Sequence, residues 1–327
     1  MAQLTVIMPV YNASAFIEEA VRSILDQTFR DFELWIVDDA STDDSIAVVK
    51  LINDPRIKFF ANSSNLGRVR TVNGLVREIS SPYFTITDAD DVSYPQRFEK
   101  QISFLKSNSD YAMCGTSYWA IDEKGFLVRK MKLLEDVSEL RAAALHESQF
   151  LGPSTMMRKS VIDHFPEFYR IYFIRNHADA DLSCMILDRF NSTNLAEPLY
   201  FYRILKSSVT RRKVTVHNLN IYKLIGHLSG QRRKQGQDCL QRGDLKEADE
   251  FMEAIQHSYD QHPSFFYRHQ AFFHLYWGLT DLAWQNAWKA FFMNPFSKNF
   301  FALGFVIFRI VVFLLRPKRH YSSLIKK

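Results

Sequence analysis

Cysteine is scarce in this sequence of 327 residues, which contains only Cys114, Cys184 and Cys239. Their odd number and wide spacing predict neither a disulfide framework nor a zinc knuckle, and they favour a reducing compartment. We also expect no secretory signal, because the opening residues lack a basic leader and Pro9 interrupts the first apolar run. A cytoplasmic protein is therefore expected.

The glycine-rich phosphate loops of two large nucleotide-binding classes are missing. The sequence contains no G-x-x-x-x-G-K-[ST] stretch, and Pro-Val-Tyr-Asn takes the place of a G-x-G-x-x-G turn after the first apolar run. The chain is therefore predicted to be neither a P-loop protein nor a dinucleotide-binding protein. The same absence disfavours a nucleotidyltransferase on a related sheet, which we keep as an alternative function.

The apolar run 300–315 is short for a membrane span and is interrupted by Arg309, whereas a spanning helix needs about 20 apolar residues. Residues 201–327 hold 20 Lys and Arg against 8 Asp and Glu, a balance of +12, and the rest holds 21 against 28, or −7. We therefore expect 300–315 to lie in the plane of an anionic membrane, peripherally at the inner face of the cell membrane. A buried core helix is the alternative. The basic runs 211–213 and 232–234 accompany no nucleic-acid-binding motif, so no nucleic-acid partner is expected.

The first two hundred residues alternate short apolar runs with helical patterns. Strands are predicted at 4–10, 33–37, 57–61 and 83–87, and helices over 17–25, 46–52, 69–79 and after Pro95. This alternation predicts an α/β fold with a mainly parallel sheet flanked by helices. We expect a catalytic domain over residues 1–210 and a basic helical region over 211–327.

The C-terminal region contains a weak internal repeat. Gly243 and Gly278 are 35 residues apart, as are Ala248 and Ala283. This spacing is near the period of tetratricopeptide helical hairpins, although ordinary helices packed on the catalytic domain fit it equally well. A non-enzymatic helical-repeat adaptor is therefore a second alternative function.

Two acidic clusters follow predicted strands. The first contains Asp38, Asp39, Asp43 and Asp44, and the second contains Asp88, Asp90 and Asp91. Open parallel sheets bind ligands at the carboxyl ends of their strands, and carboxylates suit Mg²⁺ or Mn²⁺ that bridges to substrate phosphates. Capping of the next helix is the alternative for the first cluster. Tyr11 offers an aromatic face to a base, or is a partly buried loop tyrosine.

With these motifs the chain resembles the family 2 glycosyltransferases, which have the GT-A fold. VIMPVYNASAFIEEAVRSILDQTFRDFELWIVDDASTDDS is similar to the family's opening, and NLGRVRTVNGLV with SPYFTITDADD to its middle section, including the D-x-D metal motif. GPSTMMRKSVIDHF and HADADLSCMILDRF are similar to its acceptor-side segment. The resemblance, over residues 3–205, implies an inverting transferase. It would move a sugar from a nucleotide sugar, with UDP expected, to a hydroxyl of a glycan or lipid-linked acceptor.

The resemblance also implies which residues bind the donor. The nucleotide base would be held by Pro9, Tyr11 and Asp39, with the Asp39 carboxylate accepting the imide N–H of a uracil. Arg68 would approach the nucleotide from the loop before the third helix. Asp88 would contact the ribose or the waters of the metal.

The metal and the base are implied in the same way. Asp90 would ligate Mn²⁺ or Mg²⁺ on the diphosphate. The family often has Glu-Asp at its acceptor-side motif, whereas this chain has Ala178 before Asp179. Aligning the motif gives Asp179 as the catalytic base, with Asp181 as the alternative. Either carboxylate could instead cap the helix that begins there.

Overall fold

The structure is a computed structural model that describes residues 2–175, 177–205, 214–296 and 298–325. They form two compact units: the first combines Met1–Ile121, Arg129–Arg203 and Tyr321–Lys327, and the second combines Asp122–Val128 and Ile204–His320. The boundary predicted at residue 210 and the basic run 211–213 lie outside the described residues. The division into 1–210 and 211–327 therefore stays a prediction.

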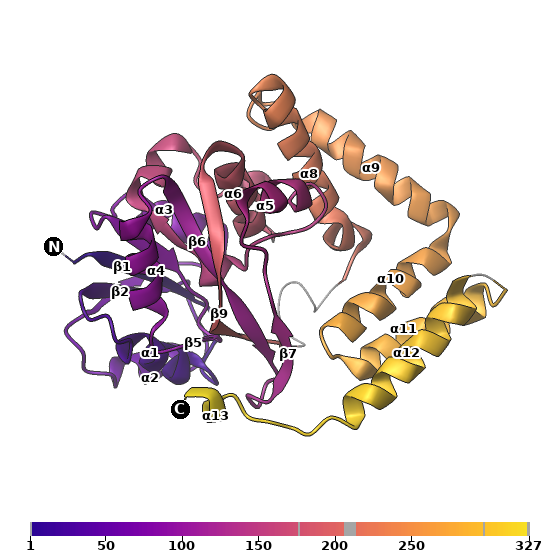
Figure 1. Ribbon diagram of the computed structural model, residues 1–327, viewed down its shortest axis with the longest axis horizontal. Helices are drawn as coiled ribbons and strands as arrows, with labels where there is room; N and C mark the ends of the chain where they lie inside the picture. Colours follow the sequence, from indigo (N-terminus) through magenta and orange to yellow (C-terminus); the bar gives the residue numbers. More distant parts are fainter. Residues whose placement is uncertain (1, 176, 206–213, 297, 326–327) are drawn as a thin grey trace. The chain divides into compact units, whose positions relative to one another are not determined.

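The first unit is built on a mixed sheet flanked by helices (Figure 1). In spatial order its strands are β3 (Ile57–Ala61), β2 (Phe32–Asp38), β1 (Leu4–Val10), β4 (Tyr83–Ile86), β8 (Met156–Arg158), β6 (Tyr111–Ile121), β9 (Asn191–Arg203) and β5 (Val92–Ser93), and β7 (Leu127–Met131) pairs with β6 outside this order. The first four strands are parallel, and β8 and β5 run antiparallel to their neighbours. The predicted α/β fold is confirmed.

Helices connect these strands and cover the sheet. The first unit contains α1 (Ile17–Leu25), α2 (Ser45–Lys50), α3 (Arg68–Val76), α4 (Arg97–Ser107), α5 (Val137–Ala143), α6 (Ala178–Arg189) and α13 (Ser322–Ile325). Short 3₁₀ helices lie at η1 (Gly152–Ser154), η2 (Lys159–His164) and η3 (Ile171–Phe173). Each strand and helix predicted before residue 108 is present, with ends that differ by a few residues.

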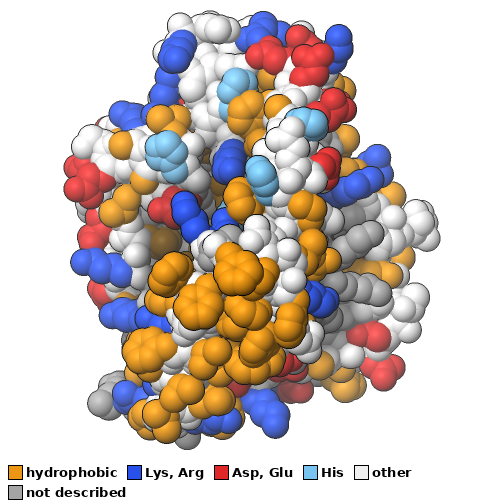
Figure 2. Space-filling view, turned by 90° about the vertical axis from the view of Figure 1, so that its right-hand side faces the viewer, with side chains coloured by type: hydrophobic (Ala, Val, Ile, Leu, Met, Phe, Trp, Pro, Cys, Tyr) orange, Lys and Arg blue, Asp and Glu red, His pale blue; other side chains and the backbone are white. Residues whose placement is uncertain are grey.

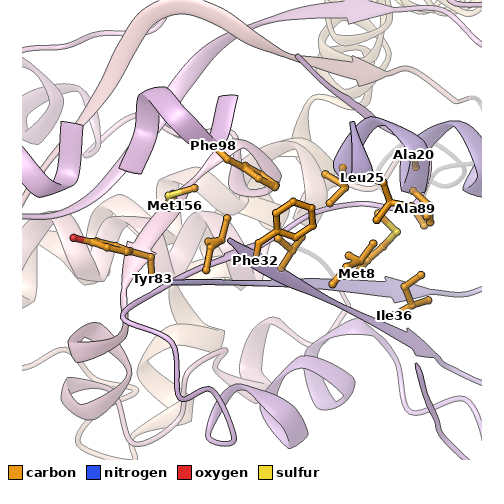
Figure 3. Packing of buried hydrophobic residues seen from close by; sticks show 14 of the residues in the cluster. Met8, Ala20, Leu25, Phe32, Ile36, Tyr83, Ala89, Phe98 and Met156 are labelled. Carbon is orange, nitrogen blue, oxygen red and sulfur yellow. The ribbon is translucent and has the colours of Figure 1, made fainter. Parts of the chain in front are cut away.

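The core explains why the first strand is an unbroken apolar run. On one face of the sheet, Met8 and Phe32 pack with residues of α1 and α4, and the rings of Phe32 and Phe98 meet edge to face with centroids 5.7 Å apart (Figure 3). Successive side chains of a strand point to opposite faces, so Ile7 faces the other layer, and it too is fully buried. A strand covered on both faces needs apolar residues at nearly every position.

The second half of the sheet was not predicted. β6 and β9 pair in parallel from Tyr111 opposite Asn191 to Ile121 opposite Arg203, with shifts of register on the way. Pro198 lies opposite Ser117 at one of these shifts. Because proline cannot donate to a ladder, its presence disfavours a long inner strand when only the sequence is read.

The chain returns to the first unit after the second. The hydroxyl group of Tyr321 donates a hydrogen bond to Glu19 at the start of α1. The ring centroids of Tyr321 and Phe201, in β9, lie 5.0 Å apart. Burial, followed by the hydrogen bond and the charge of Glu19, raises the pKa of Tyr321. Residues from both ends of the sequence therefore complete one packed region of the first unit.

The second unit consists largely of helical hairpins. Its helices are α8 (Val216–Gln235), α9 (Leu245–Gln261), α10 (Pro263–Tyr276), α11 (Thr280–Met293) and α12 (Lys298–Leu314). Gly243 joins α8 to α9 with φ of 78°, and Gly278 joins α10 to α11 with φ of 73°. Ala248 and Ala283 are fully buried at matching positions of the second helix in each hairpin. The repeat spacing therefore marks the same turn in two successive hairpins.

The two turn glycines differ in their surroundings, which gives a stability prediction. A Cβ at Gly278 would lie 2.7 Å from Cγ1 of Val128 and 3.2 Å from the ring of Phe313, whereas no described atom lies within 4 Å of one at Gly243. Both alanine variants suffer the positive φ, at about 1–2 kcal/mol. We expect Gly278→Ala to lose about 1–3 kcal/mol more than Gly243→Ala through overpacking. Urea denaturation followed by circular dichroism measures both losses, and equal losses would contradict the packing around Gly278.

Candidate active site

The loops after β1 and β2 are bonded to each other at the carboxyl edge of the sheet. Asn12 accepts a hydrogen bond from Thr42 N at 2.8 Å. Ser14 N donates to Asp43 at 3.0 Å. Burial opposes ionisation, but hydrogen bonds from Ser45 and Ser14 lower the pKa of Asp43 to about 2. The Asp43 carboxylate therefore links the loop after β2 to the loop after β1. Its neighbour Asp44 occupies the N-cap position of α2, but its side chain makes no cap hydrogen bond.

Pro9 and Tyr11 lie at the same edge. The pairing of β1 with β4 ends at Ile7. Pro9 has no backbone N–H, and on the side of β4 no ladder hydrogen bond requires one there. Tyr11 follows β1 with 51% of its surface exposed. Its ring is therefore open to a planar ligand.

Asp39 is buried just after β2 and organises the next loop. Its Oδ1 accepts hydrogen bonds from Asn62 Nδ2 at 2.7 Å, Leu66 N at 2.9 Å and Thr71 Oγ1 at 3.0 Å, and its Oδ2 accepts one from Gly67 N at 2.8 Å. Burial opposes ionisation, but these donors lower the pKa of Asp39. Among the described residues Oδ2 receives that one bond, so it can accept a second.

Arg68 begins α3, directly after the loop that Asp39 holds. Its Nη2 donates to Asp88 Oδ1 at 2.9 Å, and its Nη1 donates to the Tyr169 hydroxyl at 3.4 Å. Loss of hydration opposes the shift, but Asp88, Tyr169 and then Asp179 raise the pKa of Arg68 well above its usual value. The guanidinium of Arg68 therefore interacts electrostatically with Asp88 and Asp179, which lie far apart in the sequence.

The second acidic cluster lies after β4. Asp88, Asp90 and Asp91 each offer a carboxylate oxygen, and these oxygens lie within 4.8 Å of one another. Asp91 is buried, and its Oδ2 has no hydrogen-bond partner within the described part of the chain. Burial and the charges of Asp90 and Asp88 raise the pKa of Asp91 well above its usual value. Hard oxygen donors that are crowded in this way fit Mn²⁺ or Mg²⁺.

Arg203 holds this cluster, and sequence reasoning missed it. Its N–H donates to Asp91 Oδ1 at 2.7 Å and its Nε to the carbonyl oxygen of Asp90 at 2.8 Å. Its Nη2 donates to Glu19, and its guanidinium lies 4.8 Å from the ring centroid of Phe16. Arg203 is the last residue of β9, a strand that was not predicted, so no sequence signal pointed to this role.

Asp179 lies in the first turn of α6 and packs against Gly152. A Cβ at Gly152 would come within 2.1 Å of Asp179 Oδ2, so glycine leaves the room that this carboxylate occupies. The N-cap residue of α6 is His177, with φ of 65° and no side-chain cap bond. The capping alternative is therefore wrong for both Asp179 and Asp181.

Asp181, two residues further along, belongs to a buried ion pair. It is fully buried, and it accepts hydrogen bonds from Nε of Arg170 at 2.7 Å and from Nη2 of the same guanidinium. A carboxylate that is held on both oxygens cannot take a proton from a substrate without breaking the pair. The geometry favours Asp179 over Asp181 as the candidate base.

Backbone strain is concentrated around these residues. Within the described ranges, the non-glycine residues with positive φ are Asn12, Ala40 and His177, at 51°, 60° and 65°. They follow β1, follow β2 and precede α6. Such conformations cost of order 1–3 kcal/mol and persist where the surroundings impose them, typically at functional sites.

Sequence comparisons relate the chain to glycosyltransferases. The family model described as "Glycosyl transferase family 2" matches residues 5–165. EpsE of Bacillus subtilis (strain 168), which is named as a glycosyltransferase, is 31% identical over 217 residues, which cover 65% of this chain and 77% of EpsE. The O-antigen biosynthesis glycosyltransferase WbnJ of Escherichia coli is 28% identical over 230 residues, which cover 68% of this chain and 87% of WbnJ.

Solved structures share the fold. TarS 1–349 of S. aureus in complex with UDP-GlcNAc matches with a TM-score of 0.56 and 17% identity, over 70% of this chain and 66% of that chain. The mannosyltransferase PcManGT of Pyrobaculum calidifontis, in complex with GDP-Man and Mn²⁺, matches with a TM-score of 0.50 and 15% identity, over 96% and 87%. This likeness concerns the fold, which is the predicted GT-A fold.

The chain belongs to glycosyl transferase family 2, and it is a glycosyltransferase. The two alternative functions considered from the sequence, a nucleotidyltransferase and a non-enzymatic adaptor, are therefore wrong. Within the described residues, three of the acidic side chains in the resembling motifs, Asp88, Asp90 and Asp91, offer carboxylate oxygens within 4.8 Å of one another.

The ion pair of Asp181 gives a second stability prediction. Asp181→Asn should lower the free energy of unfolding by about 3–5 kcal/mol, because it removes the carboxylate charge that faces the buried Arg170. Asp179→Asn, in the same helical turn, should cost much less. The double variant Arg170→Met with Asp181→Leu, which removes both charges, should recover most of the loss. Denaturant titration measures all three variants, and a fully stable Asp181→Asn would refute the buried pair.

Proposed function

We propose that this glycosyltransferase moves a sugar from a UDP-sugar to a hydroxyl of a glycan or lipid-linked acceptor, with inversion at the anomeric carbon. The observation that carries the proposal is the position of Arg68, which bonds to Asp88 of the acidic cluster and feels the charge of Asp179. The guanidinium of Arg68 therefore interacts both with a residue expected to bind the donor and with the residue expected to activate the acceptor.

The nucleotide would lie at the edge formed by the first two loops. Tyr11 stacks on the base, Pro9 lines the strand end beneath it, and Asp39 Oδ2 accepts the imide N–H. In the described structure Oδ1 of Asp39 accepts three hydrogen bonds and Oδ2 accepts one. Since Oδ2 can accept one more, the single imide N–H of uracil suits this carboxylate. Guanine would present a ring N–H and an amino group together. The match to a structure with bound UDP-GlcNAc supports the same choice.

A divalent cation, Mn²⁺ or Mg²⁺, would be held by Asp90, with Asp88 contacting the ribose or the metal-bound water. When bound, such an ion neutralises the charge that develops on the departing diphosphate. The close grouping of the carboxylates of Asp88, Asp90 and Asp91, whose oxygens lie within 4.8 Å of one another, supports a cation here. A fold relative was solved with Mn²⁺.

Asp179 would act as the general base. It accepts the proton of the acceptor hydroxyl while that oxygen attacks the anomeric carbon and the bond from this carbon to the diphosphate breaks. One attack from the face opposite the leaving group inverts the configuration. Gly152 leaves space for the carboxylate, and Asp179 is among the groups whose charge raises the pKa of Arg68.

The acceptor would be a growing glycan, free or attached to a lipid, and the enzyme would work peripherally at the inner face of the cell membrane. The name of WbnJ, which refers to O-antigen biosynthesis, supports a polysaccharide product. The basic balance of residues 201–327, at +12, supports an anionic membrane as a partner.

Metal dependence tests the donor site. Asp90→Ala should abolish transfer, and it should remove the gain in UDP affinity that wild-type protein shows in Mn²⁺ relative to EDTA, as measured by calorimetry. Asp26→Ala, which removes an exposed carboxylate after α1, is the control and should keep that gain. Equal UDP affinity of the wild type in EDTA and in Mn²⁺ would count decisively against the metal role.

The base is tested by a substitution that keeps its shape. Asp179→Asn should lower transfer by about 10²–10⁴-fold, the usual contribution of a positioned general base, and leave UDP affinity near the wild-type value. Asp163→Asn, at an exposed site in η2, should transfer normally. Gly152→Ala should also reduce transfer, because its Cβ displaces Asp179. Normal transfer by Asp179→Asn would show that another group takes the proton.

A further inference from the structure

Helix α12 has two apolar faces on opposite sides. One face packs within the second unit, where buried Leu303 and Val306 join a cluster with Ala271, Ala283 and Ala287. The other face is open at Phe301 and Phe308, which are 77% and 63% exposed, and Leu315, directly after the helix, is 78% exposed. A helix that is apolar all round is normally covered all round. In the described structure α12 is covered on one side only.

The open face extends beyond α12. Phe292 at the end of α11 is largely exposed, and Phe296 in the following turn is fully exposed. We call Phe292, Phe296, Phe301, Phe305, Phe308 and Leu315 the outer patch. Figure 2 shows hydrophobic side chains gathered on this side of the molecule, with Lys and Arg side chains at the margin. Continuous apolar surface of this kind marks a site of interaction with a protein or a membrane.

The charges around the outer patch decide between these partners. Residues 282–327 contain 8 Lys and Arg and no Asp or Glu. Lys289, Lys298, Arg316 and Lys318 are all exposed. A second copy of this chain, docked through the same surface, would place like charges opposite one another, which is costly. An anionic membrane instead offers headgroups of complementary charge, and its interface with water accepts aromatic side chains.

We infer that the outer patch docks on the surface of an anionic phospholipid bilayer, with α12 lying in the plane of the interface. No helix within the described ranges is long and apolar enough to cross a membrane. Phenylalanines of the outer patch enter the interface while the basic residues at its margin meet the headgroups. The inference deepens the membrane contact in the proposed function and rests on it, since it names the surface that makes this contact.

The structure permits a test that does not disturb the fold. Phe301→Gln with Phe308→Gln removes two exposed rings and leaves the buried face of α12 intact. Binding of the full-length protein to vesicles of phosphatidylcholine with phosphatidylglycerol should fall by about tenfold for each ring removed. Leu51→Gln with Leu245→Gln, at 85% and 54% exposed positions outside the outer patch, is the matched control and should bind as wild type does.

A second variant tests charge without touching the apolar residues. Replacing Lys289, Lys298, Arg316 and Lys318 by Gln should weaken binding to the anionic vesicles by roughly fivefold per residue. Wild-type binding should fall with added salt and should be far weaker on phosphatidylcholine alone. Thermal melting of every variant should match the wild type, because all the replaced side chains are exposed.

Several outcomes would overturn the inference. Wild-type protein that ignores anionic vesicles refutes it, as does a control variant that loses binding as fully as the outer-patch variant. If light scattering shows a wild-type dimer that becomes a monomer in the outer-patch variant, the surface is a self-association site. Vesicle binding is read without substrate, so failure of UDP-sugar turnover would refute the proposed function and leave this result standing.

Discussion

The repulsion among Asp88, Asp90 and Asp91 is the constraint around which the first unit is arranged. Three carboxylates whose oxygens lie within 4.8 Å cannot all stay ionised without positive charge nearby. The chain supplies the guanidinium of Arg68, which bonds to Asp88. Arg203 adds its backbone N–H to Asp91 and its Nε to the carbonyl oxygen of Asp90. Burial and the charges of Asp90 and Asp88 still raise the pKa of Asp91 well above its usual value, so the cluster remains short of positive charge.

The first turn of α6 shows how local geometry gives two chemically identical side chains different surroundings. Asp179 and Asp181 are two positions apart, so they point to different sides of α6. Asp181 meets Arg170 in the core, whereas Asp179 lies against Gly152 and within the field of Arg68. Both oxygens of Asp181 are therefore occupied by an ion pair, whereas Asp179 is the residue proposed as the base. A motif that records only residue types cannot make this distinction.

Prediction from the sequence succeeded where the signal is local. The strands and helices up to residue 107 each carry their own period of apolar residues, and they were predicted nearly to their ends. β6 and β9 were missed because their pairing joins Tyr111 to Asn191 and passes through Pro198, which no short window reveals. The acidic cluster was found from its spacing. The partners Arg203 and Arg170, and the donors that surround Asp39, depend on contacts that exist only after folding.

The contact of Tyr321 with Glu19 and Phe201 has a consequence for biosynthesis. A ribosome makes the chain in one direction, so Glu19 and Phe201 emerge long before their partner Tyr321 does. The whole second unit must be synthesised before Tyr321 can cover the ring of Phe201. Until then this part of the nascent first unit lacks the contacts of Tyr321, and it is completed only when the returning segment of the chain arrives.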